Sequence, residues 1–152
     1  MQQTRIGIIG CGVISNTYIR DIQRFYDKLY ICACADINTA LAQEHAAKYN
    51  IPTDCSVDEL LSADEIEIVV NLTPPQFHTE INRKILLAGK HLFCEKPFAL
   101  TLSDADEILR LANEKGLAVA APRTPLWVLP CRLAISSCKT AGSAHRCMQR
   151  PI

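Results

Sequence analysis

The feature that most constrains this fold is a short apolar run passing directly into a pair of glycines. Residues 5–9 read Arg-Ile-Gly-Ile-Ile, typical of a buried β-strand, and Gly10-Cys11-Gly12 follows at once. From Val13 to about Tyr26, apolar residues recur at helical spacing. A strand that turns through glycines into a helix predicts a βα unit, with backbone N–H groups available at the turn.

The rest of the chain repeats this alternation. Strand-sized apolar runs occupy residues 29–35, 66–72, 91–94 and 117–121, and helices are expected at residues 39–49, from a capping box at Ser56, at residues 76–88, and from a Ser103 cap to Lys115. Strands separated by helices pair in parallel through right-handed crossovers. The predicted fold class is therefore α/β, a doubly wound parallel sheet of the Rossmann NAD(P)-binding type.

Length and charge narrow the possible functions. The 152 residues carry 16 basic and 16 acidic side chains, so neither nucleic acid nor an anionic membrane is indicated as a partner. The longest apolar runs are far shorter than a membrane span. Residues 1–5 lead straight into a strand without the organisation of a signal peptide. We therefore expect a cytoplasmic protein without a membrane anchor.

The eight cysteines do not form a pattern typical of zinc binding. Cys32 and Cys34 alternate with alanines in an expected strand, so both should lie on the same face of the sheet. We interpret most of the cysteines as reduced, buried small hydrophobic residues, and we expect no metal site.

The glycine turn and the end of the next strand suit a dinucleotide. Backbone N–H groups around Gly10 and Gly12 can approach a pyrophosphate at a helix N-terminus, although Ser15 stands where the usual third glycine would be. Asp36 can accept hydrogen bonds from ribose hydroxyls and would repel a 2′-phosphate, which favours NAD over NADP. The simpler alternatives are an ordinary βα turn and a helix-capping aspartate.

Two further loops follow expected strands at the same edge of the sheet. In residues 71–75, Asn-Leu-Thr-Pro-Pro, the Thr73 hydroxyl and the backbone are left for cofactor contact. His78 lies just inside the following helix, where it either touches the cofactor or substrate or simply starts and packs the helix.

Glu95-Lys96-Pro97 follows the strand at residues 91–94. A lysine placed against a nicotinamide ring can donate a hydrogen bond or a proton to a substrate hydroxyl, and Glu95 could hold its orientation. The alternatives are a solvated surface ion pair and a helix start containing proline.

Four stretches, residues 6–12, 33–36, 69–75 and 89–97, resemble the N-terminal domain of the glucose–fructose oxidoreductase/inositol dehydrogenase (Gfo/Idh/MocA) family. The resemblance extends from Thr4 to Pro122. It implies reversible hydride transfer between NAD(P) and a hydroxyl carbon of a sugar, polyol or related compound, with Lys96 as the catalytic or substrate-orienting lysine. It also implies that the other catalytic groups, and any homo-oligomer, depend on a second substrate domain that this sequence lacks.

The candidate cofactor-binding residues are therefore Gly10, Cys11, Gly12, Val13, Ile14, Asp36, Leu72, Thr73, Pro74, Pro75, His78, Glu95 and Lys96. Lys96 is also the candidate catalytic residue.

Composition changes after Pro122. Residues 123–152 have five basic and no acidic side chains and show no periodicity. Where the family continues with Asp-Thr-x-Leu-Gly, residues 123–127 read Arg-Thr-Pro-Leu-Trp, and a frame shifted within the Arg123 codon permits the family's sequence. We expect a dinucleotide-binding domain at residues 1–122 and an out-of-frame or disordered tail at residues 123–152. The simpler alternative is a basic surface tail.

The predicted function is thus that of the NAD(P)-binding domain of an oxidoreductase, truncated and with impaired catalysis. One alternative is a non-enzymatic nucleotide-binding or interaction module. Another is an adenosine-binding domain for a reaction such as methyl transfer, against which the Glu-Lys-Pro run argues. The pattern leaves the substrate open.

Overall fold

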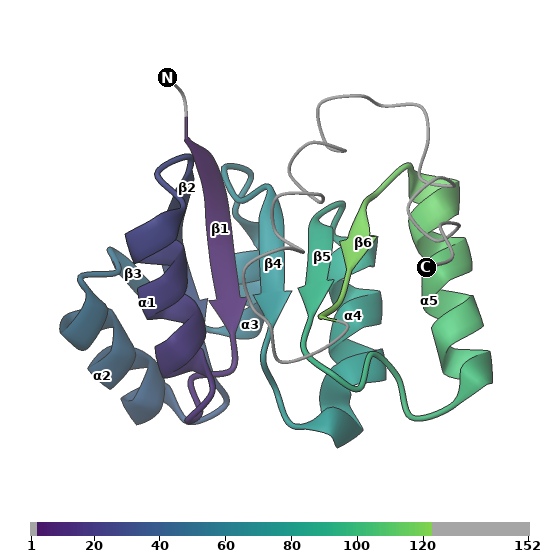
Figure 1. Cartoon of the computed structure of the whole chain (residues 1–152), viewed down its shortest axis with the longest axis horizontal. Coiled ribbons are helices and arrows are strands. Elements are labelled where there is room, and N and C mark those ends of the chain that lie inside the picture. The colour runs from purple at the N-terminus through teal and green to yellow at the C-terminus, as the bar shows by residue number, and fades with distance from the viewer. Residues whose placement is uncertain (1–2, 123–152) are drawn as a thin grey trace.

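Strand β1 (Thr4–Ile9) lies inside a six-stranded parallel sheet (Figure 1). The structure is a computed structural model that describes residues 3–122. The other strands are β2 (Leu29–Ala35), β3 (Thr53–Cys55), β4 (Ile68–Asn71), β5 (His91–Cys94) and β6 (Val119–Ala120). Their spatial order, β3-β2-β1-β4-β5-β6, places the switch in strand order between β1 and β4. The prediction of a doubly wound sheet is confirmed.

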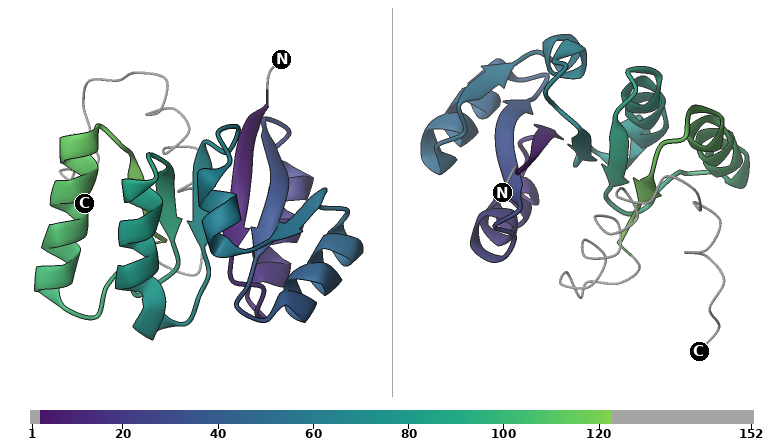
Figure 2. Two further views of the ribbon diagram at one scale, coloured as in Figure 1. Left: turned by 180° about the vertical axis from the view of Figure 1, so that it is seen from behind. Right: turned by 90° about the horizontal axis from the view of Figure 1, so that it is seen from above.

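Helices cover both faces of this sheet, as the view from above in Figure 2 shows. The helices are α1 (Ser15–Phe25), α2 (Thr39–Tyr49), α3 (Val57–Ser62), α4 (His78–Leu87) and α5 (Leu102–Lys115), with a short 3₁₀ turn, η1 (Pro75–Phe77), before α4. Buried side chains of α1 and α2 belong to one hydrophobic cluster, and those of α3, α4 and α5 belong to another. The sheet therefore separates two cores.

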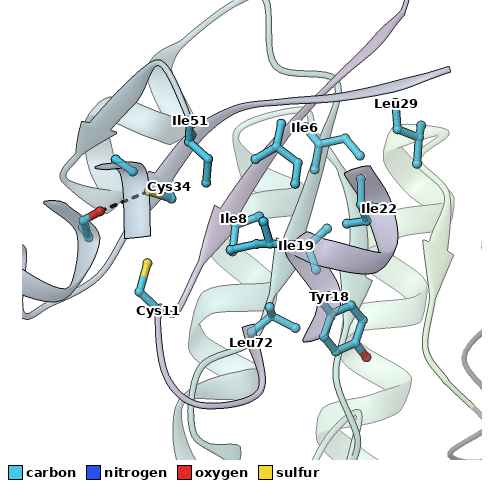
Figure 3. Close-up of a cluster of buried hydrophobic side chains, with 14 of the residues drawn as sticks. Ile6, Ile8, Cys11, Tyr18, Ile19, Ile22, Leu29, Cys34, Ile51 and Leu72 are labelled. Atoms are coloured by element: carbon cyan, nitrogen blue, oxygen red, sulfur yellow. Dashed lines mark hydrogen bonds between the residues drawn. The ribbon is translucent and has the colours of Figure 1, made fainter. Parts of the chain in front are cut away.

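The first core forms where α1 lies on β1 (Figure 3). Ile6 and Ile8 of β1 meet Ile19 and Ile22 of α1, and both Ile8 and Ile19 are fully buried. Complete burial of each such side chain contributes about 1.5–3 kcal/mol. The helical spacing of apolar residues after the glycine turn thus fixes α1 against the strand that precedes it.

Most helix ends follow the local sequence signals. At α3, the expected capping box is present, because Ser56 and Glu59 satisfy each other's backbone N–H groups. The start of α5 differs from the expectation: Thr101, not Ser103, is the cap, and its hydroxyl accepts a hydrogen bond from the Asp104 N–H at 3.1 Å. Two hydroxyl residues two positions apart offer the same local signal, so the path of the preceding loop decides between them.

The sequence pattern missed strand β3 and overextended β6. Each is an edge strand of three residues or fewer, too short to show alternation. The expected strand at residues 66–72 is trimmed to residues 68–71, and the helix expected at residues 76–88 begins as η1. None of these changes moves the candidate site residues away from the carboxyl ends of the strands.

The expectation that Cys32 and Cys34 share a face is wrong. The pairing of β1 with β2 shifts register between Ile6 and Gly7, which oppose Ile31 and Ala33, so Cys32 is an extra residue in the ladder. A bulge of this kind interrupts the alternation of side chains. Cys34 therefore joins the core under α1 and α2, whereas Cys32 joins the core under α3, α4 and α5.

The five cysteines among residues 3–122 are all free thiols. Burial raises the pKa of Cys55 to about 11 and that of Cys94 to about 12, so both are neutral at physiological pH. They behave as small apolar side chains, as the sequence predicted. Across this part of the chain, no helix combines the length and the apolar character needed to cross a membrane. The interpretation of residues 123–152 lies outside the described residues.

His91, at the start of β5, connects that strand to the segment before β6. Its Nδ1 accepts a hydrogen bond from the Ala118 N–H at 3.0 Å, so this nitrogen must be unprotonated. Burial lowers the pKa of His91, and Glu67 opposes that effect in part. As the pH falls, the unfolded chain, whose histidine pKa is about 6.5, takes up a proton before the folded protein does.

We therefore expect His91 to support stability fully above about pH 6.5, and the free energy of unfolding to fall as the pH drops from there towards the lowered pKa. Urea unfolding on either side of this value measures the loss. The His91→Gln variant should lose less stability than the wild type over the same pH step. An equal loss in both proteins would contradict this role.

Candidate functional site

The carboxyl ends of the strands bring the candidate residues to one edge of the sheet. In Figure 1, the arrowheads of β1, β4 and β5 all point to the lower edge, where the loops to α1, η1 and α5 begin. Because the strands are parallel, loops that are up to 85 residues apart in sequence, such as those at Gly10 and Glu95, share this edge. Ligands of open α/β sheets bind at this kind of edge.

Gly10 and Gly12, the two glycines of the first loop, differ in what surrounds them. Gly10 has a φ of +101°, and a Cβ there would lie 2.7–2.8 Å from backbone atoms of Leu72 and Thr73. Glycine at this position lets the loop after β1 lie against the loop after β4. A Cβ at Gly12 would meet nothing within 4 Å, so this side of the turn is open.

The open side of the turn has backbone donors to offer. Helix α1 begins after Ile14 with no side-chain cap and no acidic residue in its first turn. Within residues 3–122, no hydrogen bond engages the N–H groups of Gly12, Val13 or Ile14. Unpaired N–H groups together with the positive end of a helix dipole form an anion-binding site.

Asp36 is tied to this same loop. Its Oδ2 accepts a hydrogen bond from the Cys11 N–H at 2.7 Å, and its Oδ1 accepts one from the Asn38 N–H at 2.8 Å. The turn role and a ligand role coexist, because each carboxylate oxygen can accept a second bond. The helix cap of α2 is Asn38, whose side chain accepts from the Ala40 N–H.

Two apolar residues of these loops, one after Gly12 and one after Asp36, are exposed. Val13 is 92% exposed and Ile37 is 99% exposed, whereas the Cys11 side chain is buried. These two exposed branched side chains therefore provide apolar surface in the same loops as the free N–H groups of the turn and the carboxylate of Asp36.

Ser15, at the position of the usual third glycine, is fully buried. Its hydroxyl donates to the Gly12 carbonyl at 2.6 Å and lies 2.9 Å from Nε2 of His45. His45 comes from α2, and its Nδ1 lies 3.1 Å from the Leu41 carbonyl. Serine thus fits in place of glycine and connects the turn to α2. Sequence reasoning had no signal for His45, because its partner is 30 residues away.

The loop after β4 is held by its own polar groups. Asn71 accepts hydrogen bonds from both the N–H (3.1 Å) and the hydroxyl (2.7 Å) of Thr73. Leu72 is buried, whereas Pro74 and Pro75 are exposed at the rim. The Thr73 hydroxyl, which the sequence left free for a cofactor, is therefore already engaged as a donor and retains its acceptor capacity.

Glu95 and Lys96 point to different surroundings. Glu95 is only 8% exposed and accepts a hydrogen bond from the Tyr18 hydroxyl of α1. Lys96 is exposed, and no ion pair joins it to Glu95 among the described residues. Glu95 therefore contacts α1 directly, and a role of Glu95 in holding the orientation of Lys96 stays a prediction. Tyr18 lies within the helix that the sequence predicts from Val13 to about Tyr26, but helical spacing alone does not reveal its hydrogen-bond partner.

His78 lies beneath the loops at this edge of the sheet and is not exposed at its surface. It is 0% exposed, and both ring nitrogens lie beside backbone carbonyl oxygens. In this arrangement it offers no free polar atom to a ligand. Among residues 3–122, no three histidine, cysteine or acidic side chains gather in a way that could hold a metal ion.

Comparison with known proteins places this geometry in context. Residues 4–121 match the Gfo/Idh/MocA family, described as an oxidoreductase family with an NAD-binding Rossmann fold. An uncharacterized oxidoreductase of Schizosaccharomyces pombe is 35% identical over 130 residues, which cover 84% of this chain and 35% of the relative. The inositol 2-dehydrogenase of Salmonella typhimurium is 27% identical over 114 residues, which cover 74% of this chain and 34% of that protein.

Among solved structures, UDP-N-acetylglucosamine 3-dehydrogenase from Acidithiobacillus ferrooxidans matches with a TM-score of 0.71 and 30% identity, over 80% of this chain and 38% of that chain. The chain therefore spans about a third of the length of the relatives that it matches.

Proposed function

Since this chain belongs to the Gfo/Idh/MocA family of oxidoreductases, whose fold is the NAD-binding Rossmann fold, we propose that residues 1–122 form its dinucleotide-binding domain. The observation that carries this proposal is the glycine turn. Gly12 leaves open space, the amides of residues 12–14 are free within the described chain, and α1 begins there without a cap. This arrangement suits the pyrophosphate of NAD(H).

With the pyrophosphate at the glycine turn, the adenosine ribose and the nicotinamide can be assigned to residues along the same edge of the sheet. Asp36, held by two backbone N–H groups, accepts the adenosine ribose hydroxyls and disfavours the 2′-phosphate of NADP. Val13 and Ile37 supply exposed apolar surface near the adenosine end. At the other end, Thr73, Pro74 and Lys96 line the rim towards the nicotinamide, and the amide and side chain of Cys11 support the turn from below.

Lys96 is the residue we propose for chemistry. Its exposed ammonium can donate a hydrogen bond or a proton to a substrate oxygen, while bound NAD(H) would supply the hydride chemistry. Its neighbour Glu95 faces α1, and within residues 3–122 no ion pair engages the Lys96 cation.

The substrate class is taken from the relatives. Their names describe dehydrogenation of an inositol and of UDP-N-acetylglucosamine. We propose that the protein acts on a hydroxyl carbon of a sugar, polyol or related compound. A cytoplasmic location, and a homo-oligomer that depends on a second domain, belong to the same proposal.

Calorimetric titration with NADH and with ADP-ribose, which lacks the nicotinamide, tests this proposal. The wild-type chain should bind both. The Lys96→Ala variant should weaken NADH roughly 3- to 10-fold, about one charge-assisted hydrogen bond at an exposed site, and leave ADP-ribose unchanged. If neither compound binds the folded wild-type chain, the alternative of a domain with another function is favoured. An equal loss for both compounds would place Lys96 away from the nicotinamide.

A further inference from the structure

Three polar side chains lie fully buried beneath the loops after β4 and β5. Asn71 ends β4, and His78 and Asn82 lie one turn apart on α4, all with 0% exposure. Burying polar groups is costly unless their hydrogen bonds are made. No buried side-chain nitrogen or oxygen among the described residues lacks a partner.

These side chains join the two loops. Asn71 donates to the Asn82 side-chain oxygen at 2.8 Å, and Asn82 donates to the Phe98 carbonyl at 3.2 Å. The ring of His78 spans the same gap, with Nε2 2.7 Å from the Thr73 carbonyl and Nδ1 2.6 Å from the Pro97 carbonyl. Lys96 directly precedes Pro97, so the bonded backbone is the segment that carries the proposed catalytic lysine.

The two contacts of His78 also determine where its protons lie. A carbonyl oxygen has no hydrogen to donate, so each short contact needs an N–H on the imidazole. A neutral ring has one N–H and would direct a lone pair at the other carbonyl at hydrogen-bond distance. Only the imidazolium satisfies both oxygens.

The surroundings of His78 act on a cation in both directions. Full burial and the helix dipole at the start of α4 oppose it, whereas the two carbonyl oxygens at 2.6–2.7 Å favour it. The loop at residues 72–77 contains no ionisable side chain, and α4 carries Glu80, Arg83 and Lys84.

The ionisable groups of α4 are engaged elsewhere, since Lys84 pairs with Glu80 and Arg83 pairs with Glu107 of α5. After β5 come Glu95, which is acidic, and Lys96, whereas burial keeps the preceding Cys94 thiol neutral. Asp104 lies in the first turn of α5.

We propose that His78 is a positioning residue. With a proton on each ring nitrogen, and assisted by Asn71 and Asn82, it clamps the loop after β5, which carries Lys96, to the loop after β4, which carries Thr73. The importance of this clamp for catalysis rests on the proposed function. The clamp itself, and its protonation, are properties of the fold and can be measured without any ligand.

The first test is a long-range ¹H–¹⁵N correlation spectrum of the ¹⁵N-histidine-labelled chain at neutral pH. We expect both ring nitrogens of His78 to show the shifts of protonated nitrogens. Its signals are assigned by their disappearance in the His78→Gln variant, with His45→Gln as the control that must leave them in place. A ring nitrogen with the shift of an unprotonated nitrogen would overturn the proposal, and this test on the wild type stands even if the variant fails to fold.

The second test is amide hydrogen exchange. In His78→Gln, exchange of the hydrogen-bonded amides of Thr73 and Glu95 should speed up together, because one broken clamp releases both loops. Residues 29–35 of β2 should keep their protection. In the matched variant His91→Gln, which removes a half-buried histidine from the opposite end of β5, the two loops should stay protected. Faster exchange throughout the sheet, or no change in the loops, would contradict the clamp.

Cofactor titration separates this inference from the proposed function. If the wild type binds NADH, His78→Gln should reduce the affinity for NADH more than the affinity for ADP-ribose, since the clamp acts at the nicotinamide end. Equal losses would contradict positioning of Lys96. If the wild type binds neither compound, the proposed function fails, while the spectrum and the exchange data still decide whether the clamp exists.

Discussion

Replacing Gly10 with alanine is expected to destabilise the protein by about 2–5 kcal/mol, the sum of a strained left-handed backbone and an overpacked contact. The physical reason is that φ is +101° and the added methyl group would lie 2.7–2.8 Å from backbone atoms of Leu72 and Thr73. Backbone atoms cannot move aside as a flexible side chain can. Urea unfolding followed by circular dichroism measures the loss.

The matched control is Gly12→Ala, two residues further along the same turn. Its methyl group meets nothing within 4 Å, and its φ is not in the left-handed range, so stability should change by less than about 0.5 kcal/mol. Affinity for NADH should nevertheless fall, because the methyl group would occupy the space proposed for the pyrophosphate. A stable Gly10→Ala protein would show that the contact with Leu72 is not tight. Unchanged NADH affinity in Gly12→Ala would place the phosphates elsewhere.

Removing the carboxylate of Asp36 should have the second large effect. We expect Asp36→Ala to weaken NADH binding about 10- to 100-fold, or roughly 1.4–2.8 kcal/mol, and to leave NADPH binding nearly unchanged. The ribose hydroxyls lose an acceptor, whereas the 2′-phosphate loses a repulsive charge. Parallel calorimetric titrations with the two cofactors measure the change in preference.

Asp36 also has a structural role that needs a control. Two backbone N–H groups, from Cys11 and Asn38, lose their partner in Asp36→Ala. The exposed Asn38 N–H can turn to water, whereas loss of the partner of the part-buried Cys11 N–H costs about 1–3 kcal/mol. Asp36→Asn keeps the shape and one acceptor oxygen, so it should retain more stability while still losing the preference for NADH. If Asp36→Asn discriminates between the cofactors as strongly as the wild type, the charge of Asp36 is not the basis of specificity.

The sequence by itself was sufficient for most of the elements and for their order along the chain. Apolar runs predicted β1, β2, β4 and β5, helical spacing predicted α1, and a composition rich in helix-forming residues predicted α2, because these signals lie within a few consecutive residues. Alternation of strands and helices then leaves few topologies, so the parallel doubly wound sheet could be predicted as well. The glycine turn and Asp36 were identified by their place after a strand, without any knowledge of their contacts.

Edge strands and helix starts lay at the limit of this reasoning. The three residues of β3 are too few to show a period, and Thr101 and Ser103 carry the same capping signal. The bulge at Cys32 reversed the face of that side chain, because register depends on a partner strand that the local pattern does not contain. These features are decided where separate elements meet.

Only the tertiary structure decided how the side chains of the site are used. Gly10 must be glycine because of Leu72 and Thr73, more than 60 residues later, and Glu95 meets Tyr18, 77 residues earlier. Likewise, His78 is buried between the carbonyl oxygens of two loops instead of facing a ligand. Local periodicity reports which face of an element is buried, whereas hydrogen-bond partners across the sheet depend on how the elements pack together, and that arrangement exists only in the folded chain.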